Sequence, residues 1–164
     1  MKEANSMKVT NLKEAINYIK EMNKGNEYLE YNLEEGTISL EWYKAILEEA
    51  KKYNPKRVID IGSNVNMFGY LFANEGIEYI GIERHADLIP IENEMIKFIN
   101  KDYYEVREEF KDDIIISCLC VGYLIPIEDV KAKALIINDS VGENENYKCI
   151  ARRVELNGQV RKED

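Results

Sequence analysis

Short apolar runs, each rich in β-branched residues, recur through the middle of the chain. The five runs occupy residues 58–61, 79–82, 96–99, 114–116 and 134–137. Runs this short that lack regular alternation with polar residues are typical of strands buried on both faces of a sheet. The segments between them supply the crossovers that parallel pairing requires. We therefore predict an α/β fold built on five buried parallel strands.

Two N-terminal segments instead carry apolar residues at helical spacing. In the first, over residues 12–22, Asn11 is a candidate N-cap with Glu14 three residues further on. The second, over residues 40–52, follows Ser39, another candidate N-cap. Because each helix has one apolar face, we expect both to cover the sheet.

The crossover between the first two strands predicts a third helix, over residues 65–75. Phe68, Leu71 and Phe72 give it an apolar face, and Gly76 is a typical C-terminal stop. Amides at the start of such a helix can bind polar groups of a ligand.

The C-terminal part of the chain carries a hairpin signal. Two strand-like segments, residues 147–156 and 159–162, flank Asn157-Gly158, a dipeptide favoured in two-residue β-turns. We predict an antiparallel hairpin that closes the edge of the sheet.

We expect one domain over residues 1–164, because no repeat or linker divides the chain. Within it, residues 1–54 form a helical cover, residues 55–140 form the α/β core, and residues 141–164 form the hairpin.

Charge and hydropathy restrict the partners. The 164 residues include 31 Asp and Glu but only 22 Lys and Arg, which gives a formal net charge of -9. This charge repels phosphate backbones, so nucleic acid is disfavoured as a partner. The chain has no apolar run long enough to span a bilayer and no stretch typical of a signal peptide at its start. We expect a cytoplasmic protein with no membrane partner.

The sequence predicts no metal site, because it has one histidine, His85, and three cysteines without metal-ligand spacing. Cys118 and Cys120 lie two residues apart, so we expect them to share one face of a strand as reduced, structural thiols.

Residues 57–83 carry the most informative motif. A strand ends at Asp60, a loop containing Gly62 follows, and the next strand ends at Glu83. Glycine lets such a loop turn and approach a ligand closely. An acid about twenty residues further on can accept hydrogen bonds from ribose hydroxyls. The spacing predicts a nucleotide-binding βαβ unit.

The order and spacing of these residues resemble the class I S-adenosylmethionine-dependent methyltransferases over roughly residues 55–140. That family has an acid followed by three glycines; Asp60 and Gly62 match, while Asn64 and Asn66 replace the later two. The loop also looks like that of the FkbM-type O-methyltransferases, in which Asn occupies the position of Asn64. Asparagine tolerates positive φ better than other non-glycine residues.

This resemblance implies that the loop binds S-adenosylmethionine through Gly62, Ser63, Asn64 and Asn66, with Asp60 preceding them. Asn66 either fills space that the cofactor needs or donates a new hydrogen bond to it. We expect the second outcome.

The resemblance also assigns the ends of the next two strands. Glu83 matches the acid that binds the cofactor ribose, and Arg84 and His85 follow where side chains often border the adenine. Asp102 falls where the family has an acid that contacts the adenine amino group. Asp60, Glu83 and Asp102 are thus expected to converge on one crevice.

The fourth strand of the family ends facing the transferred methyl group, and this chain offers Cys118 and Tyr123 there. Cys118 is a further expected cofactor contact. His85 and Tyr123 are the candidate catalytic side chains. A solvent-exposed loop position is the alternative for His85, and a small core residue is the alternative for Cys118.

The fold class that the resemblance implies is a Rossmann-like methyltransferase type with strand order 3-2-1-4-5, a C-terminal antiparallel pair and two N-terminal helices. The implied function is methyl transfer from S-adenosylmethionine to a small molecule or a protein side chain. The alternative is a non-catalytic Rossmann-like binding or interaction protein that has lost turnover.

Overall fold

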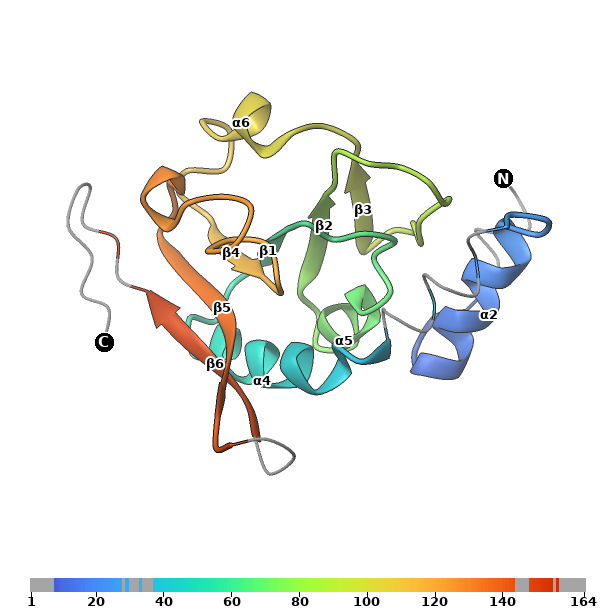
Figure 1. Cartoon of the computed structure of the whole chain (residues 1–164), viewed down its shortest axis with the longest axis horizontal. Coiled ribbons are helices and arrows are strands. Elements are labelled where there is room, and N and C mark those ends of the chain that lie inside the picture. Colours follow the sequence, from blue (N-terminus) through green and yellow to red (C-terminus); the bar gives the residue numbers. More distant parts are fainter. Residues whose placement is uncertain are drawn as a thin grey trace.

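The chain forms an α/β structure around one six-stranded, mostly parallel sheet (Figure 1). A computed structural model describes residues 8–27, 29, 33, 37–143, 148–154 and 156. The strands are β1 (Arg57–Ile61), β2 (Glu78–Ile82), β3 (Ile96–Ile99), β4 (Ile114–Ser117), β5 (Ala134–Val141) and β6 (Lys148–Val154).

The five strands predicted from the apolar runs are all confirmed. They pair in parallel in the order β3-β2-β1-β4-β5, which is the order expected above. The order reverses between β1 and β4, so the loops that follow these two strands leave the sheet side by side. In open α/β sheets, ligands bind beside the carboxyl ends of the strands at such a point of reversal.

The two predicted N-terminal helices are also confirmed, as α2 (Leu12–Met22) and α4 (Leu40–Lys51). Asn11 caps α2 by accepting the backbone N–H of Glu14. The predicted cap of α4 is wrong, because Ser39 has helical φ and ψ and its side chain makes no capping bond. Ser39 and Cys118 instead both line the same cavity, which is described below.

The third predicted helix is shorter than expected, since α5 comprises only Gly69–Ala73. Asn64 and Asn66 have φ values of 54° and 60°, and this left-handed backbone keeps residues 63–68 out of a helix. Gly76, the predicted stop, has a φ of 76° and lies three residues after the end of α5, in the turn that follows the helix.

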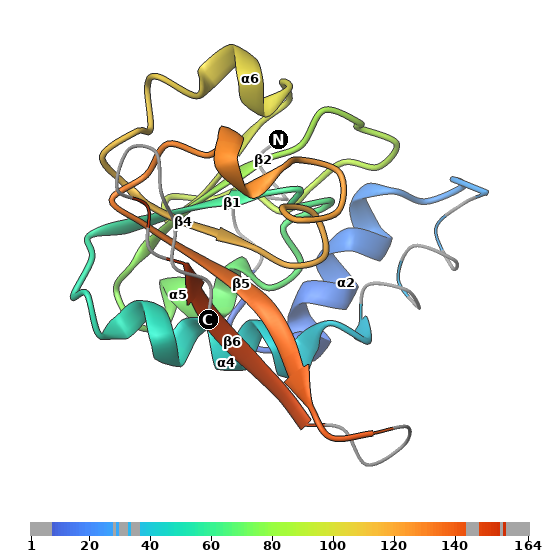
Figure 2. The ribbon, with the colours of Figure 1, turned by 60° about the vertical axis from the view of Figure 1, so that its left-hand side comes forward.

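Alternate residues of the strands face two separate cores. On one face, Val58, Tyr79 and Ile116 pack with α2, α4 and α5. On the other face, residues such as Ile59 and Ile82 pack with α6 (Tyr103–Val106) and residues near the short helix η1 (Ile127–Asp129). Figure 2 shows α4 and α5 on one side of the sheet and α6 on the other.

The antiparallel pair at the C-terminal edge of the sheet is formed by β5 and β6. β6 confirms most of the predicted strand over residues 147–156, and it pairs with the extended β5. The turn at 157–158 and the segment 159–162 lie outside the described residues. Trp42 of α4 reaches this edge, where its indole N–H donates to the Asp139 carbonyl at 2.7 Å.

In the part of the chain that the structure describes, no helix is both long enough and apolar enough to cross a bilayer.

Candidate functional site

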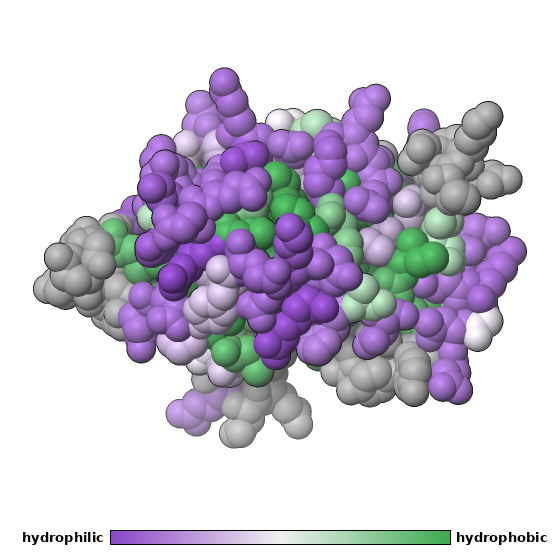
Figure 3. Space-filling model, turned by 90° about the horizontal axis from the view of Figure 1, so that it is seen from above, coloured by the Kyte–Doolittle hydropathy of each residue, from purple (hydrophilic) through white to green (hydrophobic). Residues whose placement is uncertain are grey.

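Two cavities meet at the carboxyl ends of the parallel strands. The strand-end cavity has a volume of about 190 Å³ and the helix-side cavity about 230 Å³. Gly62, after β1, and Leu119, after β4, line both of them. Figure 3 views this end of the molecule, where an apolar area lies between hydrophilic ridges. The shared residues place both cavities at the point where the strand order reverses.

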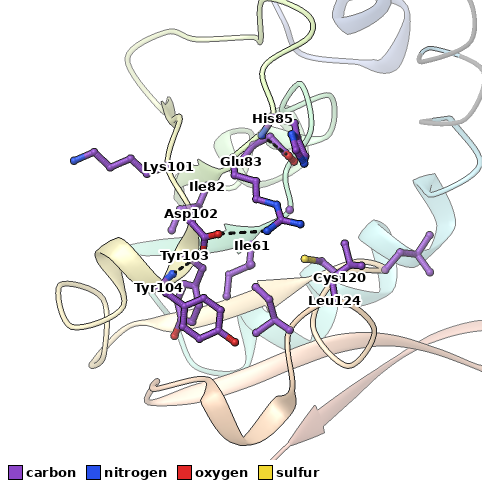
Figure 4. Close-up of a pocket in the computed structure, with 14 residues that line it drawn as sticks. Ile61, Ile82, Glu83, His85, Lys101, Asp102, Tyr103, Tyr104, Cys120 and Leu124 are labelled. Carbon is purple, nitrogen blue, oxygen red and sulfur yellow. Dashed lines mark hydrogen bonds and ion pairs between the residues drawn. The ribbon is translucent and has the colours of Figure 1, made fainter.

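The strand-end cavity combines an apolar interior with ionised side chains. Figure 4 shows Glu83 and His85 toward one end, and Asp102 with Tyr103 and Tyr104 toward the other. Its lining consists of Ile61, Gly62, Ile82, Glu83, Arg84, His85, Lys101, Asp102, Tyr103, Tyr104, Leu119, Cys120, Leu124 and Ile125.

Glu83 is held by two backbone donors. Its Oε1 accepts the N–H of Asn64 at 2.8 Å and its Oε2 accepts the N–H of His85 at 3.1 Å. Each carboxylate oxygen has a second lone pair. Glu83 therefore has a fixed orientation at the end of β2 and can still accept two hydrogen bonds from a ligand.

Asp102 caps α6 and also pairs with a cation. Its Oδ1 accepts the Tyr104 N–H at 3.0 Å, and the Glu105 side chain bonds back to the Asp102 N–H, which completes a capping box. Its Oδ2 lies 3.4 Å from Nη1 of Arg84. Since Arg84 follows β2 and Asp102 follows β3, this pair links the ends of two neighbouring strands.

The Tyr104 ring is part of the same wall. It is 46% exposed, and its hydroxyl donates to Oδ2 of Asp129 at 2.6 Å. This bond to a carboxylate stabilises the protonated phenol and raises the pKa of Tyr104 to about 12. At neutral pH Tyr104 is therefore an uncharged aromatic surface.

Gly62 is required by close packing in the loop after β1. Its φ is 80°, and a β-carbon at this position would lie 2.7 Å from Cβ of Cys120. The N–H groups of Gly62 and Ser63 both donate to the Ile82 carbonyl, at 2.8 and 3.3 Å. Together with the Asn64 bond to Glu83, these contacts tie the loop to the end of β2.

The helix-side cavity is predominantly apolar. Ser63, Asn64 and Cys118 line it, together with the side chains of α4 and of the loop before α5. Burial raises the pKa of the Cys118 thiol to about 12, with a further contribution from Asp60, so the thiol stays neutral and is a poor nucleophile. The lining residues are Ile38, Ser39, Tyr43, Gly62, Ser63, Asn64, Val65, Met67, Phe68, Cys118 and Leu119.

Three backbone donors in this lining have no partner. Among the described residues, the N–H groups of Val65, Met67 and Phe68 donate no hydrogen bond that meets the distance and angle criteria. The three residues themselves line the helix-side cavity.

Asp60, the first acid in the predicted set, lies apart from both cavities. It has no solvent exposure, and its Oδ2 accepts the hydroxyl protons of Tyr43, at 2.7 Å, and of Tyr79. Its Oδ1 has no hydrogen-bond partner. Burial without a neighbouring cation raises the pKa of Asp60 to about 7, and the two tyrosine bonds only partly oppose this. Glu83 and Asp102 thus lie in the expected crevice, whereas Asp60 is buried and lines neither cavity.

Asn66 also faces the interior. Its side chain has no solvent exposure, and Nδ2 donates to the carbonyls of Ile91 and Lys97, both at 3.1 Å. Asn66 lines neither cavity. The structure therefore gives it a role that the sequence did not suggest, which is to fasten the loop after β1 to the segment around β3.

The loop after β4 separates two residues that were expected together. Leu119 has a φ of 65°, which is unusual for a bulky side chain, and Asn138 accepts its N–H at 2.8 Å. The prediction that Cys118 and Cys120 share a face is wrong, because β4 ends at Ser117 and the chain turns at Leu119. Cys118 packs in the helix-side core and Cys120 in the opposite one.

The two candidate catalytic side chains occupy different positions. His85 is exposed and lines the strand-end cavity. Tyr123 is 71% exposed and lines neither cavity. Over the described ranges, no group of three or more Cys, His, Asp or Glu side chains is arranged to hold a metal ion.

Sequence reasoning did not assign Leu124 or Tyr104 to the site, and it did not predict the positive φ of Leu119. A leucine with positive φ has no sequence signal. Tyr104 has one in retrospect, because it lies two residues after an acid at a strand end.

In comparisons with known proteins, the chain matches no family model and no curated protein.

Proposed function

We propose that the chain is an S-adenosylmethionine-dependent methyltransferase that acts on a small molecule or a protein side chain. One observation carries the proposal: two cavities meet over Gly62 and Leu119 where the strand order reverses, and Glu83 is fixed at the end of β2 beside them. An elongated ligand with a nucleoside at one end fits this arrangement.

The strand-end cavity would hold the adenosine part. Glu83 keeps a free lone pair on each oxygen for the two ribose hydroxyls, because its bonds to Asn64 and His85 use only one each. Ile61, Ile82 and other apolar side chains provide walls for a flat base. The Arg84–Asp102 pair lies at the polar edge of that base.

The helix-side cavity would hold the amino-acid tail. The unpartnered N–H groups of Val65, Met67 and Phe68 are donors for its carboxylate. The Ser63 hydroxyl has no hydrogen-bond partner among the described residues, but it is buried against Gly81 of β2 and is not counted among these donors. The sulfur of the cofactor would then lie between the two cavities, over Gly62 and Leu119, which line both of them.

S-adenosylmethionine supplies an electrophilic methyl group when it is bound. The task of this chain is to fix the direction from which a nucleophile approaches that group and to exclude water. Leu119 and its neighbour Cys118 present an apolar surface there, and neither is ionised. Such a site suits an acceptor that is nucleophilic without a strong catalytic base.

The second candidate is a non-catalytic binding protein with the same fold. It is favoured by the helix-side cavity, whose lining residues include no Asp, Glu, Lys, Arg or His. Asp60, which has a pKa near neutrality, is shielded from that cavity. Both candidates require the nucleoside site, and they differ in turnover.

Calorimetric titration of the full chain with S-adenosylhomocysteine tests the shared requirement. We expect binding by the wild type, and a loss of about tenfold or more in Glu83→Ala, which removes a charged acceptor of two hydrogen bonds. Glu78→Ala is the matched control, because Glu78 lies at the opposite end of the same strand. Absence of binding at millimolar ligand would reject the methyltransferase proposal.

Turnover separates the two candidates. Incubation with S-adenosylmethionine labelled in its methyl group, together with pools of phenols, thiols and amines and with protein extracts, should give a labelled product that Glu83→Ala fails to form. Ligand binding without label transfer to any acceptor supports the non-catalytic candidate.

A further inference from the structure

The Tyr104 ring is held on the wall of the strand-end cavity by contacts from outside the cavity. Its hydroxyl donates to Asp129, the last residue of η1, and the Arg107 guanidinium lies 5.6 Å from the ring centroid. Arg107 also donates to the Asp129 carbonyl at 3.1 Å. Asp129 and Arg107 line neither cavity, whereas Tyr104 does.

These contacts fix an aromatic ring that remains half exposed. The backbone N–H of Tyr104 is bonded to Asp102, so main chain and hydroxyl are held at opposite ends of the residue. Arg107 covers one face of the ring, and because Arg107 is absent from the lining, the covered face is turned away from the cavity. The Tyr103 ring is the other aromatic neighbour, 6.0 Å away between centroids and tilted by 56°, and Tyr104 as a whole stays 46% exposed at the wall of the strand-end cavity. An exposed tyrosine with no function would not need three restraints.

We propose that Tyr104 is the platform on which a purine base stacks, and that Asp129 and Arg107 are positioning residues that hold it. The inference rests on the proposed function for the nucleoside site, but it requires neither a sulfonium nor methyl transfer. Stacking favours the larger π-surface of a purine over a pyrimidine. The ligand class is therefore a purine nucleoside, whatever its 5′ substituent.

Tyr53, which lines neither cavity, supplies a matched control. Its hydroxyl accepts a hydrogen bond from Nη1 of Arg153 at 3.1 Å, and the Arg153 guanidinium lies 6.0 Å from its ring centroid. Tyr53→Phe and Tyr104→Phe thus each remove one hydroxyl from a tyrosine beside an arginine, and only the second changes the proposed platform.

The test is calorimetric titration of the full chain with adenosine and with uridine. Tyr104→Leu should weaken adenosine binding by between about 5-fold and 100-fold, the contribution of one base stacked on an aromatic ring. It should also reduce the preference for adenosine over uridine, which a purely structural role would not change. Tyr104→Trp should restore both. Tyr104→Phe and Asp129→Ala should each weaken adenosine binding several-fold, and Tyr53→Phe should leave it unchanged.

Two results would overturn the inference: no adenosine binding by the wild type, or an unchanged adenosine preference in Tyr104→Leu. Adenosine binding without S-adenosylhomocysteine binding rejects the proposed methyltransferase but supports the platform. Binding of both ligands with no effect of Tyr104→Leu does the reverse.

Discussion

Asp60 and Glu83 end neighbouring parallel strands, and their surroundings are opposite. Asp60 faces the helix-covered core, where two tyrosine hydroxyls are its partners and solvent has no access. Glu83 lies just beyond its strand, where two backbone amides orient it toward a cavity. An acid at a strand end is therefore not by itself a ligand-binding acid. Whether such an acid lines the crevice depends on its side chain, which can point into the core beside the sheet or toward the end of the strand.

The same contrast applies to the two asparagines that replace glycines. Both Asn64 and Asn66 have positive φ, but Asn64 offers its backbone N–H to Glu83 at the open site, while the Asn66 side chain is buried against two carbonyls. The left-handed backbone at Asn64 thus helps to orient Glu83 beside the cavity, and the left-handed backbone at Asn66 belongs to the packed interior.

The largest expected effect is on the pH dependence of the free energy of unfolding. Because the folded-state pKa of Asp60 is raised to about 7, the folded chain retains a proton that the unfolded chain loses at lower pH. The contribution of Asp60 to stability is therefore undiminished below about pH 4, falls as the pH rises to about 7, and then levels off. The loss is up to about 4 kcal/mol over this window.

Urea unfolding of the wild type and Asp60→Asn at pH 5 and pH 8 measures this contribution. The difference in unfolding free energy between the two proteins should shift in favour of Asp60→Asn as the pH rises. A difference between the two proteins that is the same at pH 5 and pH 8 would contradict the raised pKa of Asp60.

A smaller effect is expected from the asparagines. Asn66→Gly relieves the positive φ but leaves the carbonyls of Ile91 and Lys97 without their donor, so we expect a net loss of about 2–4 kcal/mol in unfolding free energy. Asn64→Gly removes no buried side-chain bond, and its stability should stay within about 1 kcal/mol of the wild type. Equal stability of the two variants in urea would contradict the buried role of Asn66.

The smallest effect concerns Leu119, which lies between the two cavities. Leu119→Gly removes the cost of a left-handed leucine, about 1–2 kcal/mol, and adds the backbone entropy cost of glycine. We expect a gain of at most about 1 kcal/mol in thermal or urea unfolding. Under the proposed function, the same variant should bind S-adenosylhomocysteine more weakly, because both cavities lose this side chain from their lining. A clear loss of stability would show that Leu119 is there for packing.

The sequence predicted the sheet well, because strands buried on both faces leave unbroken apolar runs such as 79–82 and 114–116. It overestimated α5, since helical spacing of Phe68 and Phe72 persists even where Asn64 and Asn66 hold the preceding backbone in a loop. Spacing reports which residues are apolar, and the φ angles of the polar residues between them decide where a helix begins.

The site was predicted in outline. Glu83 lies where the βαβ spacing placed it and Asp102 where the family resemblance placed it, because parallel strands bring their ends to one edge. The direction of the Asp60 and Asn66 side chains could not be predicted, because it depends on contacts with Tyr43, Tyr79 and Ile91 that are distant in sequence. Turns such as the one at Leu119 are likewise fixed by a distant partner, Asn138.

The hydrogen bonds that join the loop after β1 to the end of β2 have a consequence for hydrogen exchange. The amide protons of Gly62, Ser63 and Asn64 all bond to the Ile82 carbonyl or to Glu83. None of them can exchange with solvent deuterium unless the loop separates from β2, so their exchange reports one shared opening event. A ligand that binds Glu83 would slow this opening. Slower exchange of the three amides would therefore report that the site is occupied.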